Sequence, residues 1–141
     1  MTLRPMIEYS DVRGRPVQLT KAEQDWFWEL VEKANKVSGN RIQIIPFNFD
    51  LYTDEDGQNA LGRTYTTDPE NPLSDDAKTL ITIDTYHIHE CFDVVFNGAY
   101  CFEDATLEET IAHEIAHTHY WKHGKRHAAL TERYLSLMQA A

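Results

Sequence analysis

Apolar side chains recur every three or four residues between positions 26 and 37, which is the spacing of one face of an α-helix. Thr20 and Glu23 precede this stretch and can form a capping box, in which each side chain accepts a hydrogen bond from the other residue's backbone amide. Ser38 and Gly39 follow the stretch and are expected to end the helix. The stripe that should face the core consists of Trp26, Phe27, Leu30, Val31, Ala34 and Val37.

The flanking segments show weaker patterns. Residues 1–19 are interrupted by prolines and a glycine and are expected to be an irregular lead-in. Residues 41–49 read RIQIIPFNF, which predicts a strand, and Pro46 within them indicates a sheet edge or a bulge. Residues 78–89 alternate between apolar and polar positions and predict a second strand.

The middle of the chain is expected to hold a long loop and a hairpin. Residues 50–77 are polar and rich in Asp, Asn, Gly and Pro, which favours a loop. Two short apolar runs, 92–96 and 99–102, flank Asn97 and Gly98. Asn-Gly is the strongest short-range signal of a hairpin, so we expect these two runs to pair as strands.

Two further helices are expected in the last part of the chain. Thr106 and Glu109 repeat the capping-box pattern and should open a helix that runs to about His119. The apolar face of this helix, expected to pack on the sheet, consists of Leu107, Ile111 and Ile115. A last helix should start after Gly124 and run to about Gln139. Its apolar stripe consists of His127, Leu130, Tyr134, Leu137 and Met138.

Composition narrows the class of protein. The chain has 141 residues, 42% hydrophobic and 26% charged, which fits one soluble globular domain over residues 1–141. It contains no apolar run of membrane-spanning length and no secretory signal at its N-terminus, so we expect a cytoplasmic protein with no membrane partner.

The net charge of −10 is unevenly distributed. Residues 50–104 hold 13 acidic side chains against only Arg63 and Lys78. An acidic middle repels phosphate backbones, so direct nucleic-acid binding is not expected. A local basic patch, whose usual meaning is a solvated face, consists of Lys122, Lys125 and Arg126.

Five of the seven histidines lie between residues 113 and 127, where the sequence HEIAH has the form HExxH. Residues four apart on a helix share a face, so His113 and His117 can bind one metal ion. Glu114 is rotated by about 100° from His113, which places its carboxylate beside the ion, where a water-activating base belongs. A surface helix that happens to carry His and Glu explains the helix but not this spacing.

A catalytic zinc ion needs a third protein ligand and an open position for water. His123 is the strongest candidate, and it requires the helix to end near residues 119–121 so that the chain can turn back. His119, His127 or a distant carboxylate are the alternatives. His127 lies on the apolar stripe of the last helix, which favours a packed histidine or one that supports a ligand.

Other potential ligands have simpler interpretations. His87 and His89 share one face of the predicted strand and are expected to be a solvated pair, with a second metal site as the alternative. Cys91 and Cys101 lack a CxxC spacing and are expected to be buried thiols rather than part of a zinc ribbon.

The segment HEIAHTHYWKHGKRHAALTERYLSLM resembles the SprT-like zinc peptidases, the Spartan-related group of HExxH zincins. That family shows HExxH, then a His-Gly pair, then an aromatic residue three positions after the Gly, leading into a helix. The resemblance covers residues 106–138 and implies zinc bound by His113, His117 and His123, with Glu114 as the base. It also implies a small zincin-like α+β domain with a mixed or antiparallel sheet, an N-terminal helix, the HExxH helix and a C-terminal helix.

The chain departs from the family pattern in three places. Only five residues separate HExxH from His123, fewer than in the family. Metzincins share this shorter spacing, but Tyr120 stands where they have glycine. His127 replaces the family's usual aromatic residue. No zinc ribbon follows, so the resemblance is to a short form of the domain.

The expected function is therefore that of a zinc metallopeptidase, in which Glu114 acts as general base on a zinc-bound water and the partner is a protein or peptide substrate. The strand expected near 92–102 could hold an extended peptide by strand addition. Tyr120 or Tyr134 could donate to the developing oxyanion.

Three alternatives stay open. The first is a protease specific for one regulatory protein. The second is a zinc-binding regulatory or interaction module without turnover, closed by a fourth ligand such as His119 or His127. The third is a peptidase attached to a nucleic-acid complex through a partner.

Overall fold

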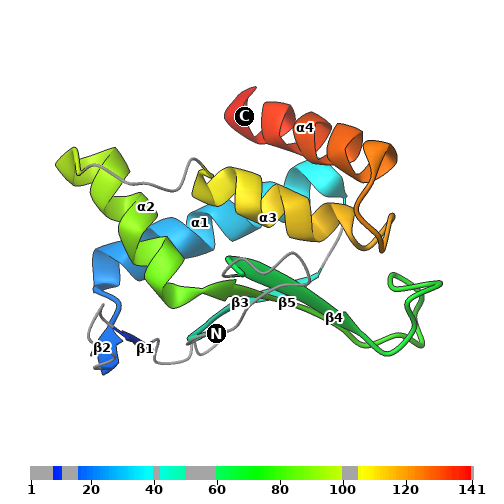
Figure 1. Cartoon of the computed structure of the whole chain (residues 1–141), viewed down its shortest axis with the longest axis horizontal. Helices are drawn as coiled ribbons and strands as arrows, with labels where there is room; N and C mark the ends of the chain where they lie inside the picture. Colours follow the sequence, from blue (N-terminus) through cyan, green and yellow to red (C-terminus); the bar gives the residue numbers. More distant parts are fainter. Residues whose placement is uncertain (1–7, 11–15, 40–41, 50–59, 100–104, 141) are drawn as a thin grey trace.

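The computed structural model describes residues 8–10, 16–39, 42–49, 60–99 and 105–140 (Figure 1). The described residues form an α+β fold with four helices, a three-stranded sheet and a separate pair of short strands, which confirms the expected fold class at this level. In chain order the elements are β1 Glu8–Ser10, β2 Pro16–Gln18, α1 Lys21–Ser38, β3 Gln43–Phe47, β4 Gly62–Thr66, β5 Thr79–Asp84, α2 Thr85–Asn97, α3 Leu107–Ala116 and α4 Lys125–Ala140.

The three-stranded sheet is mixed and has the order β3-β5-β4. β3 runs parallel to the central strand β5, and β4 runs antiparallel to it. Pro46 lies on the outer strand β3, as expected, because proline has no amide hydrogen to donate within a sheet. Helices α1, α3 and α4 lie on one side of this sheet (Figure 1), and Ile81 and Ile83 of β5 are fully buried.

The first helix follows its prediction closely. The hydroxyl of Thr20 accepts a hydrogen bond from the amide of Glu23 at 3.2 Å, and the Glu23 carboxylate accepts one from the amide of Thr20 at 2.9 Å. Gly39 ends the helix with a φ of 71°, which glycine adopts without strain. The predicted stripe packs in the core, where the buried members are Phe27, Leu30, Val31 and Ala34, with Trp26 and Val37 packed against them.

Helix α2 is the largest departure from the sequence prediction. Thr85–Asn97 is helical, so the predicted strand 78–89 is wrong beyond residue 84, and the predicted strand 92–96 of the hairpin is wrong. Asp84 caps the start of the helix, and Gly98 ends it with a φ of 68°. A left-handed glycine ends a helix as readily as it closes a two-residue hairpin, which is why the Asn-Gly signal predicted the wrong element.

Two smaller predictions also need correction. The predicted loop 50–77 contains β4, a strand with too few apolar residues to show the usual pattern. The predicted irregular lead-in contains β1 and β2, which pair antiparallel. Residues 50–59 of the loop and 100–102 of the hairpin lie outside the described residues. Within the described part of the chain, no helix combines the length and apolar character needed to cross a bilayer.

Candidate metal centre

Helix α3 presents one face to the core and a second face to the candidate site. Leu107, Ile111 and Ile115 are almost completely buried, as the sequence predicts. The hydroxyl of Thr106 accepts from the amide of Glu109 at 3.1 Å and starts the helix. The core therefore fixes the rotation of α3 about its axis, and with it the direction in which the HExxH histidines point.

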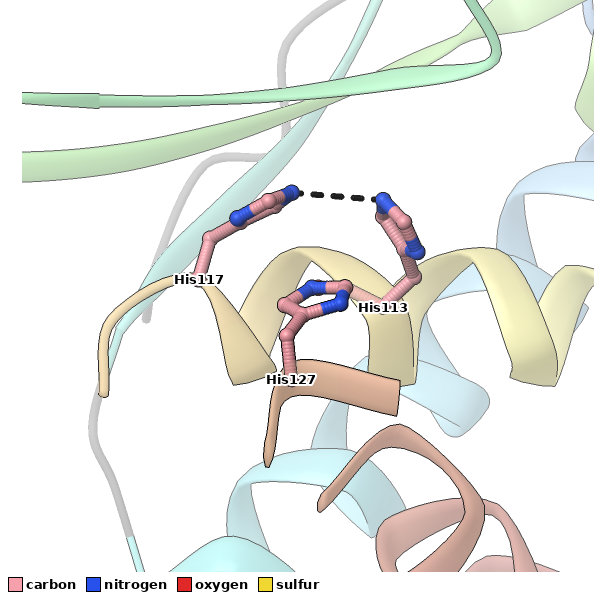
Figure 2. A group of neighbouring side chains, drawn as sticks. All are labelled: His113, His117 and His127. Atoms are coloured by element: carbon pink, nitrogen blue, oxygen red, sulfur yellow. Dashed lines mark hydrogen bonds between the residues drawn. The ribbon is translucent and has the colours of Figure 1, made fainter. Parts of the chain in front are cut away.

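The imidazoles of His113, His117 and His123 converge. Their Nε2 atoms lie 3.2 Å apart for His113 and His117, 3.2 Å for His113 and His123, and 3.1 Å for His117 and His123. Figure 2 shows the Nε2 atoms of His113 and His117 facing each other. A tetrahedral zinc ion with Zn–N bonds of about 2.0–2.1 Å holds its ligand nitrogens about 3.3–3.4 Å apart. The observed triangle matches this size closely.

Backbone carbonyl groups determine the tautomer of His117. Its Nδ1 lies 2.9 Å from the carbonyl oxygen of Trp121 and 3.3 Å from that of Tyr120. Because a carbonyl only accepts, Nδ1 must carry the hydrogen, and the Nε2 of the neutral ring keeps its lone pair. Metal-binding histidines are oriented in this way, with the second nitrogen held by a carbonyl group.

The turn that brings His123 to the site forms without a glycine. Helix α3 ends at Ala116, before the predicted end at His119, and the next two amides after His117 donate to carbonyls three residues back, at 3.0 and 3.1 Å. This tighter 3₁₀-type bonding closes the last turn, and the amide of Tyr120 donates to the carbonyl of Ala116 at 2.9 Å. Gly124 has no left-handed φ and open space at its Cβ position, so the turn does not depend on glycine there either.

His127 of α4 lies against the same two histidines (Figure 2). Its ring centroid is 4.1 Å from that of His117 and 4.4 Å from that of His113, and the three residues each offer a ligand nitrogen within 4.8 Å of the others. His113, His117 and His127 thus lie close enough to hold a metal ion. The ligand nitrogens lie closer together in the set that contains His123, at 3.1–3.2 Å, than in the set that contains His127, where they lie within 4.8 Å. In addition, Nε2 of His127 donates to the backbone carbonyl of His113 at 2.9 Å. These contacts favour His123 as the third ligand and His127 as its support.

The clustered histidines favour their neutral forms. Burial, followed by the neighbouring imidazoles, lowers the pKa of His113 to about 3. Burial and the rings of His127 and His123 lower the pKa of His117 to about 4, although its two carbonyl contacts act in the opposite direction. Burial also lowers the pKa of His127. Neutral imidazole is the form that binds a metal ion, so the cluster is suited to coordination.

Glu114 lies beside the histidines as a buried carboxyl group. Its Oε1 accepts from the hydroxyl of Thr64 at 2.9 Å, and the same hydroxyl lies 3.0 Å from the backbone carbonyl of Glu114. Its Oε2 lies 3.9 Å from Nε2 of His113, farther than the histidine nitrogens lie from one another. The carboxylate is therefore placed beside the proposed metal ligands rather than among them. Burial raises the pKa of Glu114 to about 7, while the Thr64 hydrogen bond and the charge of Arg63 oppose this rise.

Gly62 of β4 allows the strand to approach Glu114 closely. A Cβ atom at this position would lie 2.9 Å from Cγ of Glu114 and 3.1 Å from Cδ1 of Ile83. The first distance is shorter than carbon atoms tolerate and the second is tighter than most carbon contacts, so a larger residue would push against the Glu114 side chain. Gly62 and Thr64 were missed by the sequence analysis, because they are about 50 residues away in a segment predicted to be loop.

The remaining histidines do not join the cluster. His119 lies 3.3 Å from the hydroxyl of Tyr134, so both side chains are engaged with each other. His87 and His89 lie on α2 rather than on a strand. His87 is buried with its Nε2 2.8 Å from the Thr110 hydroxyl, and burial lowers its pKa to about 4.

His89 and Cys91 also have partners elsewhere. The expectation of a solvated histidine pair is wrong for His87, which is buried, whereas His89 is partly exposed and its Nδ1 lies 2.6 Å from a carboxylate oxygen of Glu23. Cys91 is buried, as expected, whereas Cys101 lies outside the described residues.

Comparisons with protein-family models, with curated proteins and with solved structures find no match for this chain. The resemblance to SprT-like peptidases therefore stays a prediction based on the sequence. The interpretation of the site depends on its own geometry.

Proposed function

We propose that this protein is a zinc-dependent metallopeptidase with a zincin-like, SprT-like domain. The observation that carries the proposal is the triangle of Nε2 atoms formed by His113, His117 and His123 next to the buried carboxylate of Glu114. Three imidazoles with an adjacent carboxylate are the donor set of a catalytic zinc site that keeps a position open. Zinc bound there would supply Lewis acidity, making water nucleophilic near neutral pH and polarising the scissile carbonyl.

Glu114 is the proposed general base. Its Oε1 is held by Thr64, so Oε2 faces the histidines and can take a proton from the attacking water. The same carboxyl group then returns the proton to the leaving amine nitrogen. The pKa of about 7 that burial gives this group is suited to a residue that both accepts and donates a proton near neutral pH.

Strand β4 is the element best placed to align an extended peptide. It is an outer strand of the described sheet, and it contacts the HExxH helix through Thr64. A peptide added along its outer edge, which no described strand occupies, would lie across the histidine cluster. The peptide-binding strand expected near 92–102 is wrong for residues 92–97, which belong to α2, and residues 100–102 lie outside the described residues.

Replacing Gly62 by alanine is expected to lower kcat by about 10–100-fold, because the added methyl group would push the Glu114 carboxylate out of place, and a misplacement of about 1 Å costs this much. KM and zinc content should change little, since neither the histidines nor the strand edge is altered. Steady-state kinetics with elemental analysis would check this. An unchanged kcat would show that Gly62 does not position the base.

The proposal is tested on purified protein that is stripped with a chelator and reloaded with zinc. We expect one zinc ion per chain, and cleavage of peptides from an unbiased library that the chelator abolishes and zinc restores. Failure to take up stoichiometric zinc would reject the metal centre. Zinc uptake without cleavage of any peptide would favour the alternative of a zinc-binding module without turnover.

A further inference from the structure

A shallow cavity of about 580 Å³, widely open to solvent, lies next to the candidate metal centre. One wall is the connection after β4, represented by Pro69 and Glu70. The other wall is the segment between α3 and α4, represented by Tyr120 and Trp121. His127, whose ring is 4.1 Å from that of His117, also lines the cavity. The cavity therefore begins one side chain away from the proposed site of reaction.

The cavity differs in charge from the rest of the molecule. The protein carries a net charge of −10, yet Lys122, Lys125 and Arg126 all line this cavity, against the single carboxylate of Glu70. All three cationic residues are exposed, and none forms an ion pair in the part of the chain that the structure describes. Unpaired cations gathered at the mouth of a cavity are positioned to attract an anionic group.

The cavity also has an aromatic wall. The side chains of Tyr120 and Trp121 are 38% and 41% exposed, although aromatic residues of this size are usually more buried. Their backbone carbonyls accept hydrogen bonds from Nδ1 of His117, so the same two residues line the cavity and orient the proposed metal ligand. An apolar side chain of a bound peptide could cover these rings. The residues next to it in the peptide would then lie near Lys122, Lys125 and Arg126, which we call the cationic rim.

We infer that this cavity is a substrate subsite for an acidic peptide segment, with an aromatic side chain against Tyr120 and Trp121 and flanking carboxylates near the cationic rim. This inference rests on the proposed peptidase function and names the substrate class for it. A nucleic acid fits less well than a short peptide, because a long phosphate backbone would extend past the three cations and be repelled by exposed Glu70, Asp75 and Asp76 on the connection after β4.

The test uses three labelled peptides that share one central Phe, flanked by Glu, Gln or Lys. Their binding is measured by fluorescence anisotropy on the zinc-loaded Glu114→Gln protein, and their cleavage on the wild type. We expect the Glu peptide to bind about tenfold more tightly than the Lys peptide at low salt, from several exposed charge pairs acting together. The same order should appear in kcat/KM.

Reversing the charge of the rim should remove this preference. In the double variant Lys125→Glu/Arg126→Glu, the Glu peptide should lose its advantage, whereas Lys36→Glu, an exposed change on α1, should retain it. Equal binding of the three peptides, or an unchanged preference in the double variant, would overturn the inference. Tighter binding of a single-stranded oligonucleotide than of the Glu peptide would assign the cavity to nucleic acid instead.

The two proposals can fail separately. Charge-selective binding without any cleavage would reject the peptidase and leave the cavity as a binding site for acidic peptides rather than a substrate subsite. Cleavage of all three peptides at equal rates would leave the peptidase standing and reject the subsite.

Discussion

The Glu114→Gln protein is expected to bind zinc normally and to lose peptide hydrolysis almost completely. The glutamine amide has nearly the same shape, and its carbonyl oxygen can accept the Thr64 hydrogen bond that now holds Oε1. It cannot take a proton from water, and removal of a general base costs about 10²–10⁴-fold in rate. The three imidazole nitrogens are untouched, so the metal content should stay at the wild-type level.

Three measurements on this variant separate a chemical effect from a structural one. The kcat on a cleaved library peptide reports the chemistry, elemental analysis reports the metal, and circular dichroism reports the fold. A variant that keeps its fold and zinc but cleaves at a tenth of the wild-type rate or faster would contradict the role assigned to Glu114.

Replacing His123 by alanine is expected to cost more zinc affinity than any change at His127. His123 supplies one corner of the Nε2 triangle, so two ligands would remain after its loss. His127 only supports the site, through its hydrogen bond to the carbonyl of His113, and loss of such a support typically costs about 10–100-fold in metal affinity. Zinc titration against a competing chelator measures both variants on one scale.

The matched variant is His127→Phe rather than His127→Ala, because His127 is buried and a truncated side chain would leave a cavity. Phenylalanine keeps the ring volume and removes both nitrogens. Retention of zinc by the His127→Phe protein, with its loss from His123→Ala, is the expected pattern. The opposite pattern would identify the site as His113, His117 and His127.

The features that were predicted correctly depend on short sequence separations. The capping box of α1 and the apolar faces of α1 and α3 involve residues within a few turns of each other. The HExxH spacing belongs to the same class, because four residues on a helix determine which side chains share a face. Local geometry was sufficient in all these cases.

The features that were missed depend on contacts across the fold. Asn97-Gly98 suits a hairpin and a helix end equally well, and only the packing of α2 selects the helix. Thr64 lies 50 residues from Glu114 in the sequence, and the polar strand sequence GRTYT contains no pattern that predicts a hydrogen bond to a carboxylate. The close approach at Gly62 follows from the same non-local packing.

The single hydroxyl of Thr64 reaches both the carboxylate and the main chain of Glu114, so the alignment of β4 on β5 decides whether the base is held at all. Slippage of β4 by one position would turn Thr64 to the opposite surface and bring Arg63 or Tyr65 in its place. The proposed general base would therefore be held in place only after β4 has paired with β5 in its native register.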